Sequence, residues 1–78
     1  MPATPRIDSL LATLNATDVG TVDAITAKLR QVQEELRDLE HPELAAAAAA
    51  AVEAIARGDV AEFKRGRAFL QSKIGHLR

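Results

Sequence analysis

The sequence predicts a small all-α protein, an antiparallel bundle of three main helices with a shorter helix at the N-terminus. The 78 residues include 16 alanines and 9 leucines but no tryptophan, tyrosine or cysteine. Alanine, leucine, glutamate and arginine favour helices, whereas the β-branched and aromatic residues that favour strands are scarce. Apolar residues also recur at intervals of three and four, the spacing of one helix face. A chain of this length accommodates one small domain, which we expect to span residues 1–78.

The first predicted helix covers about residues 5–15. Thr4 followed by Pro5 is typical of an N-cap residue with proline at the first helical position. The apolar residues that follow lie at i, i+3, i+4 and i+7: Ile7, Leu10, Leu11 and Leu14. Because this helix is short, we expect it to cover an open edge or end of the bundle formed by the other three.

The second predicted helix, about residues 21–39, begins at a capping residue, Thr21. Its apolar residues are spaced alternately by three and four: Val22, Ile25, Leu29, Val32, Leu36 and Leu39. This is a heptad seam, which must be covered by the core or by another chain. A parallel homodimer would place Glu35 against Glu40 of its partner, whereas an antiparallel one brings Lys28 near Glu35. The charges therefore favour antiparallel pairing.

The third predicted helix covers about residues 42–57. Pro42, after His41, ends the preceding helix and occupies the first position of the new one. The uninterrupted alanines from Ala45 to Ala51 make this helix thin, so a neighbouring helix can approach it closely. Arg57 and Gly58 form a helix-stop pattern, a cation in the last turn followed by glycine.

The fourth predicted helix covers about residues 59–77 and opens with Asp59 and Glu62, a capping-box spacing. One face carries its main apolar residues: Phe63, Leu70, Ile74 and Leu77. Gly66 shares this face, where a small residue permits close packing against the alanine-rich helix. Phe69 lies about a quarter-turn away, so it either widens the core face or meets a second surface.

From these patterns we predict ten residues that form the core or a protein interface. They are Val22, Ile25, Leu29, Val32, Leu36, Leu39, Phe63, Phe69, Leu70 and Ile74.

Charge is divided unevenly along the chain. Residues 1–62 carry all 11 acidic residues and 5 of the 10 basic ones, whereas residues 63–78 carry 5 basic residues and no acidic one. The candidate contacts to phosphates or to an acidic partner are Lys64, Arg65, Arg67 and Lys73. Alternatively, this helix pairs with the acidic stretch between Glu34 and Glu43 of the same chain. The formal net charge of −1 favours the second interpretation, since nucleic-acid-binding domains of this kind are basic overall.

The sequence offers little for catalysis, cofactor binding or membrane insertion. The chain has no cysteine, and His41 and His76 lack metal-ligand spacing. Its four glycines are isolated and form no phosphate-binding loop. The longest apolar run, Leu44 to Val52, has nine residues, against the roughly 20 that span a bilayer. We expect no enzyme activity, no cofactor, no metal and no membrane contact, and a cytoplasmic location.

These observations predict a non-enzymatic helical protein–protein interaction module that self-associates into a homo-oligomer. The first alternative is a module that binds nucleic acid or an acidic partner through the basic C-terminal helix. The second is a small adaptor or chaperone that pairs with a specific helical client. Self-association and pairing with a client need the same apolar stripe, so the sequence leaves both open.

Overall fold

The computed structural model describes residues 3–18 and 20–77, and these residues form an all-helical bundle. Its elements are α1 (Ala3–Asn15), the 3-10 helix η1 (Ala16–Asp18), α2 (Val22–Asp38), α3 (Pro42–Ala56) and α4 (Val60–Gly75). The described residues include no strand, so the predicted fold class is confirmed. The last three helices end one or two residues before the predicted positions.

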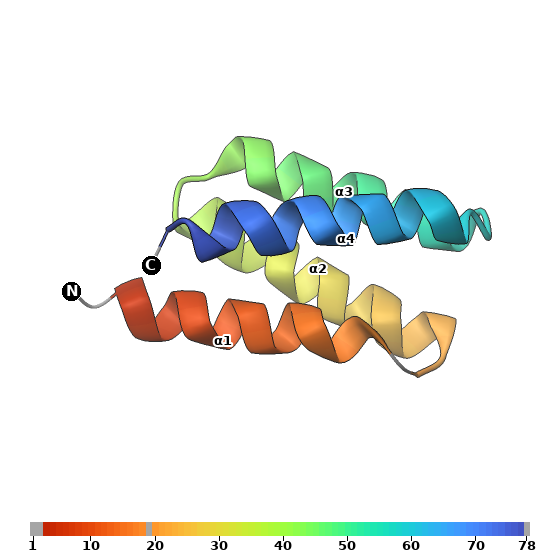
Figure 1. Ribbon diagram of the computed structural model, residues 1–78, viewed down its shortest axis with the longest axis horizontal. Helices are drawn as coiled ribbons and strands as arrows, with labels where there is room; N and C mark the ends of the chain where they lie inside the picture. Colours follow the sequence, from red (N-terminus) through yellow and green to blue (C-terminus); the bar gives the residue numbers. More distant parts are fainter. Residues whose placement is uncertain (1–2, 19, 78) are drawn as a thin grey trace.

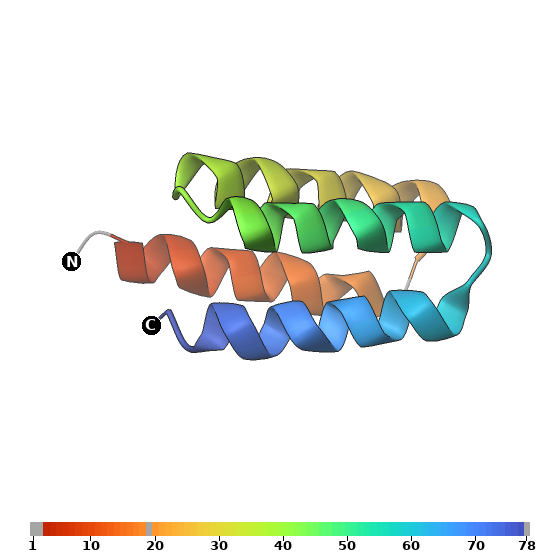
Figure 2. The ribbon, with the colours of Figure 1, turned by 90° about the horizontal axis from the view of Figure 1, so that it is seen from above.

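The four helices run alternately up and down the bundle (Figures 1 and 2). Each of α1 and α3 packs against both α2 and α4. As a result α1 lies diagonally opposite α3, and α2 lies diagonally opposite α4. The beginning of α1, the α2–α3 connection and the end of α4 share one end of the bundle (Figure 2). This is an up-down-up-down four-helix bundle with short connections.

Helix α1 differs from its prediction in where it begins. It starts at Ala3, so Thr4 and Pro5 lie in its first turn rather than at its boundary. Proline is tolerated there because the first N–H groups of a helix have no partner inside the helix. Helix α1 lies along the open edge between α2 and α4 and completes the bundle (Figure 1).

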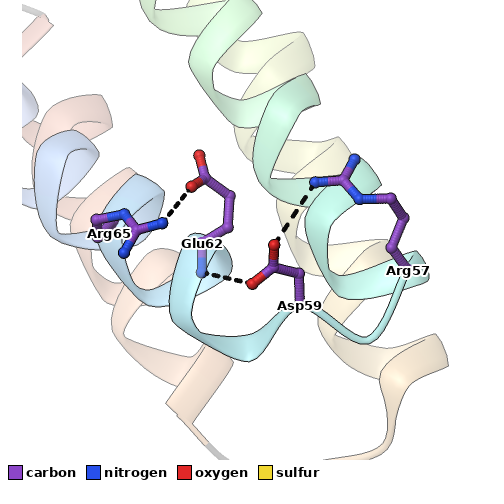
Figure 3. Close-up of polar contacts among 4 residues, drawn as sticks. All are labelled: Arg57, Asp59, Glu62 and Arg65. Atoms are coloured by element: carbon purple, nitrogen blue, oxygen red, sulfur yellow. Dashed lines mark hydrogen bonds and ion pairs between the residues drawn. The ribbon is translucent and has the colours of Figure 1, made fainter.

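The predicted N-caps of α2 and α4 are both formed. The Thr21 side chain accepts a hydrogen bond from the backbone N–H of Ala24 at 3.1 Å, and Asp59 accepts one from Glu62 at 3.1 Å. The Glu62 carboxylate, which the capping box would direct back to Asp59, instead accepts a 2.6 Å hydrogen bond from Arg65 (Figure 3). Each cap satisfies a backbone donor that the helix itself leaves free.

The end of α2 adopts a left-handed conformation without a glycine. Glu40 has a φ of 65°, in the region that favours glycine. Its N–H donates to the Arg37 carbonyl at 3.0 Å, and the N–H of His41 donates to the Leu36 carbonyl at 2.9 Å. These two bonds form a Schellman motif. His41 then occupies the N-cap position of α3, but its side chain makes no capping hydrogen bond.

Helix α3 ends with the same motif, this time at a glycine. Gly58 has a φ of 77°, and its N–H donates to the Ile55 carbonyl at 3.1 Å. The N–H of Asp59 donates to the Ala54 carbonyl at 2.9 Å. The predicted helix stop at Gly58 is therefore confirmed. Because the Asp59 N–H is used here, the reciprocal bond of the capping box is not needed.

The core contains apolar side chains from all four helices. They are Ile7, Leu10, Leu14, Ile25, Leu29, Val32, Leu36, Ala45, Ala48, Ala51, Val52, Ala54, Ile55, Phe63, Leu70 and Ile74. Helix α3 contributes mostly methyl groups, whereas the other helices contribute larger side chains. Thr17 is also buried, and its hydroxyl donates to the Leu14 carbonyl at 2.6 Å, so this buried polar group is satisfied.

Gly66 of α4 faces the alanine-rich helix, as the sequence predicts. A methyl group added at Gly66 would lie 3.5 Å from the Cβ and 4.0 Å from the Cα of Ala51. These are ordinary van der Waals distances, so alanine would also fit at this position.

Candidate protein interface

The heptad seam of α2 lies mainly inside the bundle. Ile25, Leu29, Val32 and Leu36 are buried, and Leu39 is half-buried against the core. They are covered by α1 and α3, which flank α2 on its two sides. Among the seam residues Val22 is exposed, with 52% of its surface accessible, at the end of the bundle beside the α1–α2 connection. The buried part of the seam is therefore not available to a second chain.

The predicted residues of α4 divide into a buried set and an exposed aromatic. Phe63, Leu70 and Ile74 are buried in the core. Phe69 is 46% exposed, so it does not widen the core face.

The side of α4 on which Phe69 lies follows from the two neighbours of that helix. Gln71 donates a 2.7 Å hydrogen bond to Asn15 of α1, which marks one side of α4. Gly66 faces Ala51 of α3, which marks the other side. Phe69 follows Gly66 by almost one turn, so it lies at the outer edge of α4 on the α3 side.

The outer side of α3 was not identified from the sequence. Ala46 and Ala50 are exposed on it, and Ala47 and Ala49 are half-buried. An unbroken alanine run places methyl groups all round the helix, so it leaves the solvent side as apolar as the core side. The length of the run, rather than its spacing, is the signal that could have revealed this surface.

We define the α3–α4 face as Ala46 and Ala50 of α3 together with Phe69 of α4. Exposed charges border it: Glu43 on α3, and Arg65 and Lys73 on α4, one turn before and one turn after Phe69. The Lys73 ammonium lies 5.7 Å from the centroid of the Phe69 ring, within range of a cation–π interaction. This face combines an aromatic side chain, small methyl groups and charges of both signs.

The four basic residues of α4 do not form one surface. Lys64 and Lys73 are nine positions apart, about two and a half turns, so they point to opposite sides of the helix. The guanidinium of Arg67 lies 5.8 Å from the centroid of the Phe63 ring. Arg65 hydrogen-bonds to Glu62, and this bond raises the pKa of Arg65 above its ordinary value. The charges are thus distributed around α4 instead of following one line of phosphates.

The basic helix does not pair with the acidic residues of α2, because α2 and α4 occupy opposite corners of the bundle. Glu35 pairs with Arg6 of α1 instead. Arg65 pairs with Glu62 of its own helix. The predicted pairing of the C-terminal helix with this part of the acidic stretch is therefore wrong, since sequence distance gives no information about which corner each helix occupies.

Residues 3–18 and 20–77 contain no pocket and no cluster of three or more residues suited to a metal ion. None of the helices in these residues combines the length and the apolar character needed to cross a membrane. Comparisons with protein-family models, with curated proteins and with solved structures find no match for this chain.

Proposed function

We propose that this chain is a non-enzymatic helical interaction module that self-associates through the α3–α4 face. The observation that supports this most is the exposure of Phe69 beside the outward methyl groups of Ala46 and Ala50. Aromatic residues are enriched at protein interfaces, where burying their large apolar surface stabilises the complex. We also expect the module to act in the cytoplasm.

The small core gives a physical reason for association. Four of its residues are alanines, Ala45, Ala48, Ala51 and Ala54, which bury much less apolar surface than leucine or isoleucine would. A single core in a chain of about 70–80 residues rarely supplies more than 3–5 kcal/mol of stability. A second copy on the α3–α4 face would remove more apolar surface from water and stabilise the folded state by mass action.

The two alternatives predict different behaviour. Binding of nucleic acid through α4 receives less support, because Lys64 and Lys73 lie on opposite sides of the helix. A helical client would occupy the same α3–α4 face as a second copy, but then the purified chain would remain a monomer.

The test is the mass of the purified chain by light scattering at low salt, with refractive-index detection because tryptophan and tyrosine are absent. We expect twice the 8.3 kDa of one chain and no strong absorbance at 260 nm. The mass of Phe69→Glu should fall to that of a monomer. The introduced carboxylate lies four residues before Lys73 on the same helix face, so a favourable charge contact between them preserves the helix. A monomeric wild-type chain would contradict the proposal, and absorbance at 260 nm would support nucleic-acid binding.

Val60→Glu is the matched control. Val60 is as exposed as Phe69, at 51%, but lies at the first residue of α4 and outside the α3–α4 face. A glutamate there is favourable for the helix because it lies at the positive end of the helix dipole. This variant should retain the wild-type mass. If both variants became monomers, loss of the dimer would not be specific to the α3–α4 face.

A further inference from the structure

The proposed function leaves open how the second copy is oriented, and the register between α3 and α4 constrains this orientation. These helices are antiparallel, and Gly66 lies level with Ala51. Phe69, three residues after Gly66, is therefore level with Ala48, three residues before Ala51. By the same count Lys73 is level with Leu44. Glu43 is the residue before Leu44, so it lies about 1.5 Å from that level along the helix axis.

Two kinds of two-fold axis can bring the α3–α4 faces of two copies together with their helices aligned. An axis perpendicular to the helices places α3 on α3 and α4 on α4. An axis parallel to the helices places α3 of each copy on α4 of the other. In both arrangements the same surface is used twice, as two-fold symmetry requires.

The charges of the two helices distinguish these arrangements. At the α3–α4 face, α4 presents the exposed bases Arg65, which pairs with Glu62, and Lys73, whereas α3 presents the exposed acid Glu43. The perpendicular axis therefore brings like-charged helices together. The parallel axis brings each basic α4 onto an acidic α3, and it does so twice. Like charges across an interface disfavour a pairing and opposite charges favour it.

We infer that the dimer forms about the parallel axis, with α4 of each copy antiparallel to α3 of the other. This inference rests on the proposed self-association. Rotation about this axis keeps every residue at its own level along the bundle. Phe69 then meets the other α3 level with Ala48, between the outward methyl groups of Ala46 and Ala50. Those alanines are one turn apart, so the ring enters the gap between them.

The same register places Lys73 of one copy beside Glu43 of the second copy. Both side chains are exposed, and neither takes part in an ion pair among the described residues of the single chain. The dimer therefore gains two equivalent charge pairs, one on each side of the axis, while the alanines and Phe69 supply the apolar contact between them. The methyl groups of the alanines would pack against many apolar surfaces. The positions of Lys73 and Glu43 match each other across two copies, so they favour a second copy as the partner.

The test uses two charge reversals, Lys73→Glu and Glu43→Lys, in the full chain. Each variant alone places two like-charged pairs in its homodimer, so its dissociation constant should rise at least about tenfold. In an equimolar mixture, one copy of each variant pairs with the other, and both contacts regain opposite charges. Light scattering should then show dimers again, and labelling one variant should show that these dimers contain both variants.

Arg30→Glu on α2 is the control, because Arg30 is exposed on a helix that lies outside the face. Alone, this variant should keep the wild-type mass, and it should not draw labelled Lys73→Glu into dimers to the extent that Glu43→Lys does. If the wild-type chain is a dimer but the two reversals do not rescue each other, the parallel-axis arrangement is wrong while self-association stands. A monomeric wild-type chain would refute both. Circular dichroism of each variant shows whether a loss of mass reflects unfolding.

Discussion

Replacing Gly66 with alanine should stabilise the bundle by about 1 kcal/mol. Glycine in a helix interior is about 1 kcal/mol less favourable than alanine, and Gly66 lies in the middle of α4. The added methyl group would lie 3.5 Å from the Cβ of Ala51, so it gains a normal contact without displacing α3. Its partial burial adds a fraction of the roughly 0.8 kcal/mol that a buried methylene contributes.

The effect can be measured as a shift in thermal or urea unfolding followed by circular dichroism. For a chain of this size, 1 kcal/mol corresponds to a rise in Tm of about 4–8 °C. Gly66→Leu is the matched comparison and should be destabilising, because the larger side chain extends towards Ala51. If Gly66→Ala lowered the Tm instead, α3 and α4 would have to be closer than the structure places them.

Four other substitutions, the last with a control on the same seam, test separate features of the fold by the same unfolding measurements. Glu40→Gly should stabilise the chain by roughly 0.5–1 kcal/mol, because it relieves a left-handed residue at the end of α2; a loss of stability would contradict the Schellman geometry. Gly58→Ala should cost about 1–2 kcal/mol from backbone conformation alone, since no atom lies within 4 Å of the added methyl group. Asp59→Ala should cost about 1 kcal/mol through loss of the N-cap of α4. Leu29→Asp should unfold the chain, because it places an unpaired charge at a fully buried position, whereas Val22→Asp on the exposed end of the same seam should change little; a native melt for Leu29→Asp would refute the assignment of the seam to the core.

Local sequence signals predicted three helix ends well, because a cap depends on few neighbouring residues, whereas α1 begins at Ala3 and not at the predicted Thr4 and Pro5. Thr21 and Asp59 cap α2 and α4 where the sequence indicates, and Gly58 ends α3. The left-handed Glu40 was not predictable in this way, because glycine is the usual signal for that conformation. The position is set by the three-residue connection between α2 and α3, which must reverse the chain before Pro42.

The spatial order of the helices could not be derived from periodicity. The sequence leaves Phe69 either in the core or on a second surface, and the choice depends on which helices flank α4. It also suggested that basic and acidic helices pair within the chain, although α2 and α4 lie at opposite corners. Both questions concern contacts between elements distant in the sequence, and a spacing rule within one helix carries no information about them. The outer methyl groups of Ala46 and Ala50 were missed because a uniform run has no preferred face.

The order of the helices around the bundle also affects how the chain folds. Helices α2, α3 and α4 each pack against the helix that precedes them, across connections of only a few residues. Such local contacts form quickly, and helical bundles of this kind fold in microseconds to milliseconds. The contact between α1 and α4 is different, since the hydrogen bond from Gln71 to Asn15 joins residues 56 positions apart. Closing that long loop costs more chain entropy than any other step, so we expect α1 and α4 to meet last and to be the first pair to separate when the native protein opens locally.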